Sequence, residues 1–256
     1  MKVETTMVAR IGFRLAAVLA LALFSETGMA EDATRPDGVV ELFTSQGCNS
    51  CPKADAAFAE MAAKGDVIAL SYHIDYWDYL GWRDTLATPE NTARQYDYMR
   101  AFGTRSVYTP QAVVNGRVQV NGAKSTAIAG ALEGMSKAGR GLTVDLSVSF
   151  SGNSVVIDTA GSDRRVDGAH LLLVYFEPPQ EVEIGRGENG GRKITYWNAV
   201  SGIQTAGMWH GKPARYEFPM SEITKKPGCV VLLQEAGKDG LPGPILGAAI
   251  IRKPQT

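Results

Sequence analysis

The residues with the clearest chemical potential are two cysteines separated by two positions, Cys48 and Cys51. Thiols at this spacing can close into a local disulfide and open again, so the pair is suited to thiol–disulfide exchange. A purely structural disulfide is the competing interpretation for a protein in an oxidising compartment. A zinc site would need more nitrogen or sulfur ligands, and the sequence has no second Cys-Xaa-Xaa-Cys motif. The third cysteine, Cys229, lies in an apolar run and is expected to be buried in the core.

The elements around the pair predict which cysteine is the nucleophile and which is the resolving thiol. A strand is expected over Val39 to Phe43, and residues 53–64, which follow a proline, show the apolar spacing of a helix. A second, buried strand is expected over Val67 to Ile74, which completes a βαβ unit. Because a helix N-terminus favours a thiolate, Cys48 is assigned as the nucleophile and Cys51 as the resolving thiol.

An aromatic segment follows this unit. Residues 72–82 hold five aromatic side chains beside His73 and two acids, and packing is the favoured role of these rings over recognition. Further on, Thr109-Pro110 precedes Asn115-Gly116, which is the strongest two-residue hairpin signal. The elements expected here are a helix over residues 88–102, hairpin strands over 111–114 and 117–120, and a helix over 124–137.

The pattern changes near residue 140, where apolar and polar residues begin to alternate with the period of a strand. Runs of this kind then follow one another, joined by Gly and Pro turns, with no helical pattern of useful length between them. This arrangement predicts a β-sandwich. The expected strands cover residues 142–150, 154–158, 170–176, 193–200, 215–218, 229–234 and 245–251.

Two resemblances follow from these motifs. The strand, the Cys-Xaa-Xaa-Cys-Pro sequence, its helix and Thr109-Pro110 together resemble the thioredoxin superfamily. The run from Val40 to Cys48, the aromatic segment and Arg186-Gly187-Glu188-Asn189 resemble, more closely, a family of secreted bacterial proteins. That family is known as a domain of unknown function with a thioredoxin-like fold. The resemblance implies an α/β thioredoxin-like N-terminal domain, which the strand pattern extends by an all-β, sandwich-like C-terminal domain. The expected boundaries are 1–30 for a signal peptide, 31–140 for the first domain and 141–256 for the second.

The resemblance also implies roles for three further residues. Pro110 corresponds to the cis-proline of the superfamily, and Thr109 would offer its backbone to a substrate beside the disulfide. Glu41 corresponds to a buried carboxylate that relays protons to the resolving Cys51, at a spacing one residue from the commonest arrangement. The two residues between the cysteines match neither thioredoxin nor the usual periplasmic oxidase, which leaves the direction of exchange open.

A metal site is the alternative use of the same cysteines. With His73 they would form a soft three-ligand set, and copper chaperones of oxidase assembly use two cysteines and one histidine at a different cysteine spacing. A hydrogen-bonded core histidine is the competing interpretation of His73. No resident cofactor is expected.

Residues 185–190 match the dinucleotide fingerprint G-x-G-x-x-G in letters only. A strand rather than a crossover helix is expected after them, so the structural context of a nucleotide site is missing. The favoured interpretation is a long hairpin loop, and one hypothesis is that this loop reaches over the Cys48 region.

The N-terminus predicts export. Three basic residues and an unbroken apolar run over residues 15–24 precede Gly28-Met29-Ala30, a signal-peptidase pattern. Removing residues 1–30 takes away three of the 26 Lys and Arg and two of the 27 Asp and Glu, which leaves a formal charge of −2. We therefore expect an exported, periplasmic or secreted protein that is not an integral membrane protein after cleavage and has no nucleic-acid partner.

Three functional hypotheses follow. The first is a thiol–disulfide oxidoreductase acting on a thiol- or disulfide-containing protein or on a small thiol. The second is a non-catalytic binding protein in which the disulfide is structural, and the third is a copper-handling protein that uses Cys48, Cys51 and His73. Exposure separates the first two, because exchange requires an accessible Cys48.

Overall fold

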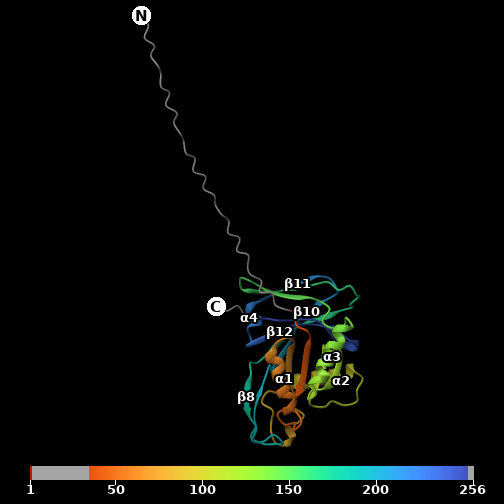
Figure 1. Ribbon diagram of the computed structural model, residues 1–256, viewed down its shortest axis with the longest axis vertical. Coiled ribbons are helices and arrows are strands. Elements are labelled where there is room, and N and C mark those ends of the chain that lie inside the picture. Colours follow the sequence, from red (N-terminus) through yellow and green to blue (C-terminus); the bar gives the residue numbers. More distant parts are fainter. Residues whose placement is uncertain (2–34, 253–256) are drawn as a thin grey trace. The chain divides into compact units, whose positions relative to one another are not determined.

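The computed structural model describes Met1 and residues 35–252 (Figure 1). Contacts join residues 35–252 in one compact unit. The predicted signal peptide and its cleavage site lie outside the described residues, so export stays a prediction. No helix in the described part of the chain has the length and apolar character needed to cross a membrane.

The first sheet holds the strands nearest the cysteines. Its four strands lie in the order β2 (Ile68–His73), β1 (Val39–Thr44), β3 (Gln111–Val114), β4 (Val118–Asn121). β1 is parallel to β2 and antiparallel to β3, and the register places Thr44 opposite His73. β3 and β4 form the hairpin expected at Asn115-Gly116, where both residues have positive φ, 49° and 62°.

Three long helices contact strands of this sheet, and they lie at the positions that the sequence predicts. α1 (Pro52–Lys64) begins with a proline and ends at Gly65, which takes the left-handed conformation with φ 75°. In α2 (Pro89–Ala101), the side chain of Thr88 accepts a hydrogen bond from the Asn91 N–H and caps the helix. α3 is Ser125–Lys137, and a short 3₁₀ turn, η1, covers Asp78–Leu80.

The later part of the chain is almost entirely β-structure, in three further sheets. One sheet has the order β10-β7-β12-β13, another has the order β11-β6-β5, and β8 pairs with β9. The bounds are β5 Leu146–Ser151, β6 Ser154–Thr159, β7 Ala169–Phe176, β8 Gln180–Glu183, β9 Lys193–Tyr196, β10 Val200–Trp209, β11 Ala214–Pro219, α4 Met220–Ile223, β12 Gly228–Ala236, η2 Lys238–Gly240 and β13 Pro242–Ile250. The prediction of a single strand over residues 193–200 is wrong, because β9 ends at Tyr196 and β10 begins at Val200.

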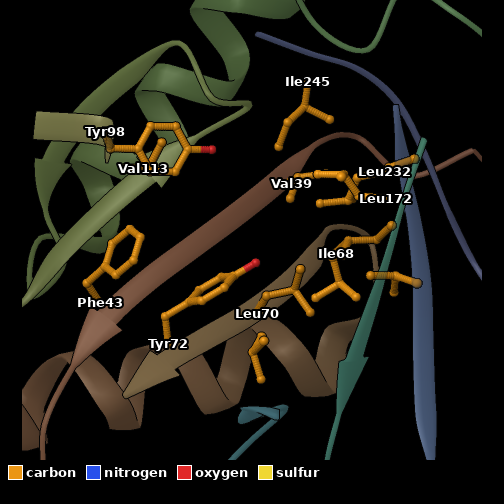
Figure 2. Close-up of a cluster of buried hydrophobic side chains, with 14 of the residues drawn as sticks. Val39, Phe43, Ile68, Leu70, Tyr72, Tyr98, Val113, Leu172, Leu232 and Ile245 are labelled. Atoms are coloured by element: carbon orange, nitrogen blue, oxygen red, sulfur yellow. The ribbon is translucent and has the colours of Figure 1, made fainter. Parts of the chain in front are cut away.

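The two faces of β1 pack against different partners, because successive side chains of a strand point to opposite faces. Val40 packs with residues of β3 and α3, and Leu42 packs with Ala54 and Phe58 of α1. Val39 and Phe43 lie on the other face, in a cluster that takes in residues of β2, α2 and four later strands, β7, β10, β12 and β13 (Figure 2). Those later residues are Leu172, Val174, Val200, Val230, Leu232, Ile245 and Ala248.

The predicted fold class, an α/β thioredoxin-like N-terminal domain followed by an all-β, sandwich-like C-terminal domain, is wrong. Of the described residues 38% are strand and 22% helical, with the strands in several sheets and no clear N-terminal α/β domain of the expected kind. The physical reason is the shared core: one face of β1 and β2 is covered partly by β7, β12 and β13. The helices therefore do not enclose the first sheet. The predicted boundary near residue 140 stays a prediction.

Candidate functional site

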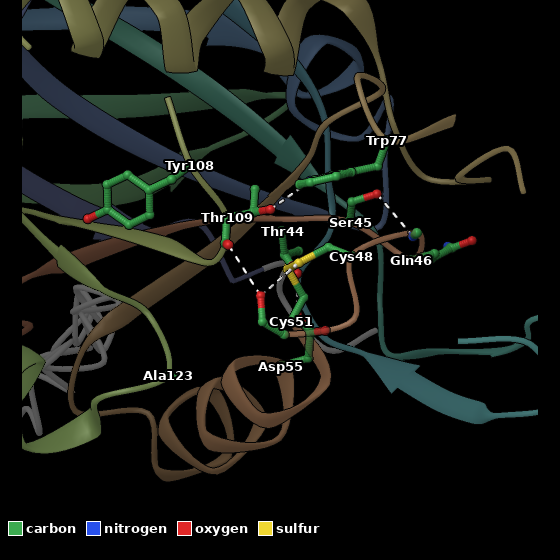
Figure 3. Close-up of a disulfide and its surroundings, with 12 residues drawn as sticks. Thr44, Ser45, Gln46, Cys48, Cys51, Asp55, Trp77, Tyr108, Thr109 and Ala123 are labelled. Atoms are coloured by element: carbon green, nitrogen blue, oxygen red, sulfur yellow. Dashed lines mark hydrogen bonds between the residues drawn. A yellow bond between two sulfur atoms is a disulfide. The ribbon is translucent and has the colours of Figure 1, made fainter. Parts of the chain in front are cut away.

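The two cysteines lie at the start of α1 and form a disulfide, with their Cα atoms 5.4 Å apart (Figure 3). Cys51 is the N-cap residue of α1, and its N–H donates to the carbonyl oxygen of Cys48 at 3.1 Å. The two residues between them are exposed, but only 2% of Cys48 and 0% of Cys51 is exposed. Thiol–disulfide exchange needs access to a sulfur, so the burial of both cysteines favours a structural disulfide.

Ser50 and the turn before β3 lie beside the disulfide. Ser50 Oγ is 3.4 Å from Cys48 Sγ and donates to the carbonyl oxygen of Thr109 at 3.4 Å. The peptide bond between Thr109 and Pro110 is cis, as the resemblance implied. The structure thus brings Thr109 and Pro110 to the disulfide, and their role in substrate binding stays a prediction.

Trp77 covers the residue that precedes Cys48. A Cβ atom on Gly47 would lie 3.1 Å from Trp77 Cβ and 3.2 Å from its carbonyl oxygen, so a larger residue at position 47 would press on the backbone at Trp77. Trp77 Nε1 donates to Thr109 Oγ1 at 2.7 Å, and its ring stacks on Tyr79, which is 76% exposed. Most rings of the aromatic segment pack as expected, and Tyr79 is the exception.

Asp55 lies one helical turn beyond Cys51. Its N–H donates to the Cys51 carbonyl oxygen at 3.0 Å, and its Oδ1 accepts from Thr44 Oγ1 at 2.7 Å. Its Oδ2 is buried with no hydrogen-bond partner among the described residues. Burial raises the pKa of Asp55 to about 7, although the Thr44 hydrogen bond opposes this shift. Side chains four residues apart share a helix face, and Figure 3 shows Asp55 beside Cys51 on that face.

A buried ion pair lies next to Asp55. His73 Nδ1 is 2.8 Å from Asp84 Oδ2, and both side chains are fully buried. Burial acts to lower the pKa of His73, but the Asp84 carboxylate raises it above its ordinary value. Burial likewise opposes ionisation of Asp84, but His73 and hydrogen bonds hold its pKa below the ordinary value. The ring of Tyr196 meets the edge of His73 with 4.7 Å between centroids.

The backbone before Cys48 is held at Gln46, which is fully buried. Its N–H donates to Asp84 Oδ2 at 2.8 Å. Its side-chain Oε1 accepts from Trp82 Nε1 at 2.8 Å and from the Thr85 N–H at 3.2 Å. Residues 82–85 therefore fix one side of the loop that carries Cys48.

A second segment holds the same loop from a distant part of the sequence. Residues 184–192, which we term the strap, join β8 to β9. Asn189 is the buried residue of its tip, with 1% exposed, and Nδ2 donates to the carbonyl oxygens of Gln46 and Cys48, both at 2.9 Å. A Cβ atom on Gly185 would lie 3.1 Å from the Trp82 ring, which shows how closely the strap packs. The hypothesis that this loop reaches the Cys48 region is confirmed.

Glu41 is placed away from the disulfide. It lies on the face of β1 opposite Leu42, which packs against α1. Arg94 Nε donates to its Oε1 at 2.8 Å, and the Tyr98 hydroxyl donates to its Oε2. The structure does not bring this carboxylate to Cys51, and both of its oxygens are engaged elsewhere.

The family described as "Protein of unknown function (DUF1223)" matches residues 39–234, which hold every element of the site. The chain belongs to this family. A crystal structure of a protein from Agrobacterium tumefaciens is similar to it, with 46% sequence identity and a TM-score of 0.78. The similarity covers 87% of this chain and 97% of that one. No curated protein matches the chain. The resemblance to a domain-of-unknown-function family is thus confirmed, whereas membership of the thioredoxin superfamily is not.

The described part of this DUF1223 protein offers little support for the alternative of a metal site. Within residues 35–252, no group of three or more His, Cys, Asp or Glu side chains is placed to hold a metal ion. His73 turns its Nδ1 to Asp84, and Asp75 accepts a hydrogen bond from Thr92 at 2.7 Å. The copper site at Cys48, Cys51 and His73 stays a prediction.

Sequence reasoning missed three residues of this DUF1223 site: Asp55, Asp84 and Asn189. Asp55 follows Cys51 by four residues, so helical spacing alone could have placed it beneath the disulfide. Asp84 and Asn189 reach the loop through contacts 38 and 141 residues apart, for which one sequence offers no spacing signal. Cys229 is buried in β12, as expected.

Proposed function

We propose that this protein is an exported thiol–disulfide oxidoreductase in which Cys48 and Cys51 exchange with a thiol or disulfide of a protein or a small thiol. The observation that carries the proposal is the buried carboxyl of Asp55, one turn beyond Cys51 and with one oxygen unpartnered. A structural disulfide requires no group that accepts and donates protons near pH 7, whereas thiol–disulfide exchange at neutral pH requires one. The pKa of Asp55, about 7, suits this task.

The residues divide the chemistry as follows in the oxidising direction. A substrate thiolate attacks Cys48 Sγ, the bond between the two sulfurs breaks, and Cys51 leaves as a thiolate that takes a proton from Asp55. A second substrate thiolate then attacks the substrate sulfur of the mixed disulfide, which forms the substrate disulfide and releases the Cys48 thiolate. The reverse sequence reduces a substrate disulfide, with the Asp55 carboxylate accepting the Cys51 proton.

The position of Cys48 supports its role as the attacked sulfur. It precedes α1, whose unpaired N–H groups stabilise a thiolate at the helix N-terminus. The exposed Ser50 hydroxyl is within 3.4 Å of its sulfur and donates a hydrogen bond toward Thr109. A substrate approaching over residues 49–50 would meet Cys48 before Cys51, which is fully buried.

The second candidate is a non-catalytic binding protein with a structural disulfide. The observation that favours it is the burial of both sulfurs, with 2% and 0% of the two residues exposed. Exchange therefore requires a small outward movement of the Cys48 loop, and a structural disulfide requires none.

The deciding experiment equilibrates the full chain, carrying Cys229→Ser so that all thiols belong to the pair, in glutathione buffers and traps the free thiols. A reduction potential above about −300 mV and a glutathione adduct at Cys48 in a Cys51→Ser variant support the oxidoreductase. A pair that resists reduction, with no adduct in that variant, makes the disulfide structural and overturns the proposal. Cys48→Ser is the matched variant, and it should give no adduct because Cys51 is fully buried.

A further inference from the structure

The strap contributes a polar group to the cysteine loop that simple packing does not require. Asn189 is 1% exposed, and its amide nitrogen donates to two backbone carbonyls that frame Gly47. Its Oδ1 has no hydrogen-bond partner among the described residues. The polar contacts of this buried side chain are therefore directed at the carbonyls of Gln46 and Cys48.

The Cys48 carbonyl is where this contact meets the redox site. The same oxygen accepts the Cys51 N–H at 3.1 Å, and this bond closes the turn that brings the two cysteines together. Asn189 thus orients the peptide group whose carbonyl accepts the hydrogen bond that closes the Cys48–Cys51 turn. The side chain does not bond to either sulfur, so any effect on exchange is exerted through the backbone.

We infer that Asn189 is a positioning residue that holds the reduced Cys48–Cys51 turn ready to close. The inference rests on the proposed exchange function and deepens it. In the oxidised protein the covalent bond itself holds the two residues together, so the loss of Asn189 changes that state little. In the dithiol the turn is held by hydrogen bonds and packing without a covalent bond, and without Asn189 the loop gains conformational freedom. The equilibrium then shifts toward the dithiol, and Cys51 resolves a mixed disulfide more slowly.

The expected size follows from the two hydrogen bonds. Losing both should move the thiol–disulfide equilibrium about tenfold toward the dithiol, which for a two-electron couple is about 30 mV. The resolution of a glutathione adduct at Cys48 should slow by a similar factor, because Cys51 spends less time within reach of the adduct.

The test uses the full chain with Asn189→Ala and Asn189→Ser, and Glu188→Ala serves as the matched control because Glu188 is an exposed residue of the same strap. Glutathione equilibria and the rate of adduct resolution are measured, and circular dichroism verifies that each oxidised protein is folded. We expect a shift toward the dithiol in Asn189→Ala, a smaller shift in Asn189→Ser, which keeps one donor, and none in Glu188→Ala. Asn189→Ser also keeps the test valid if Asn189→Ala does not fold.

The outcomes separate the inference from the proposed function. A wild-type pair that exchanges normally, with Asn189 variants of unchanged equilibrium and resolution rate, overturns the positioning role and leaves the oxidoreductase intact. Equal shifts in Glu188→Ala and Asn189→Ala indicate general loosening of the strap and also overturn it. A wild-type pair that never exchanges removes the proposed function and, with it, this inference.

Discussion

Replacing Asp55 by asparagine should make the oxidised protein more stable at neutral pH and change its stability little at about pH 4. Asparagine has nearly the same shape and can still accept the hydrogen bond from Thr44 Oγ1, which is 2.7 Å from Asp55 Oδ1. It cannot ionise, so the change removes only the cost of a buried negative charge.

The sign and the size follow from the pKa. Burial raises the pKa of Asp55 from 3.8 to about 7, so the folded protein keeps a proton that the unfolded chain releases above about pH 4. The wild-type protein therefore loses stability as the pH rises from about 4 to about 7, and this loss is complete above that pH. This interval corresponds to about 4 kcal/mol of unfolding free energy at alkaline pH, and the variant is spared that loss.

Urea unfolding of the oxidised full chain, followed by circular dichroism at pH values from about 4 to 8, measures the effect. The difference in unfolding free energy between Asp55→Asn and wild type should grow from about pH 4 to about pH 7 and level off above that. Asp163→Asn is the control, because Asp163 is an exposed carboxylate and its loss should leave no such trend. Parallel stability curves for Asp55→Asn and wild type would show that Asp55 is ionised at neutral pH, and its role as proton acceptor would be lost.

Three further changes test contacts at the site and elsewhere around the first sheet. Arg94→Leu leaves the buried Glu41 carboxylate without its charge partner, 2.7 Å away, and should cost about 3–5 kcal/mol in urea unfolding; an unchanged midpoint would contradict the ion pair. Trp77→Phe keeps an aromatic ring at this position but loses the 2.7 Å hydrogen bond from Nε1 to Thr109 Oγ1, so calorimetry should show a loss of about 1 kcal/mol. Gly116→Ala places a Cβ atom against a backbone carbonyl of β13 at φ 62° and should cost about 2 kcal/mol in urea unfolding, whereas Gly134→Ala in α3 meets nothing within 4 Å and should be neutral or stabilising.

Local elements were predictable from the sequence because their signals are local. The helix after Cys51 shows apolar spacing, begins with a proline and ends at Gly65, and the structure has α1 there. The hairpin at Asn115-Gly116 has the same kind of signal, since both residues must take positive φ. β10 was missed over most of its length, because Val200–Trp209 contains two glycines and several polar residues and is only partly buried.

The fold class was not predictable because it depends on which strands share a core. Phe43 and Leu70 are apolar in any arrangement, and nothing in their spacing indicates that they pack with Leu172 and Leu232. The expected thioredoxin-like fold of the first part of the chain did not include later strands in its core. The structure packs residues of β7, β12 and β13 against one face of the first sheet.

The site was predictable in part. The spacing of Cys48 and Cys51 predicted the pair, and the resemblance to the thioredoxin superfamily pointed to Thr109 and Pro110. The structure brings all four residues together. The resemblance assigned the buried carboxylate to Glu41, but strand alternation puts Glu41 on the face of β1 away from α1. Asp55 occupies the place beside Cys51 instead.

The strap has a consequence for the order of events during synthesis. Cys48 and Cys51 leave the ribosome more than 130 residues before Asn189, which completes the hydrogen bonds of their loop. A partly made chain therefore carries both thiols without the side chain that pins their turn. Until Asn189 has been made, the cysteine loop lacks the two hydrogen bonds that this side chain donates to it in the folded protein.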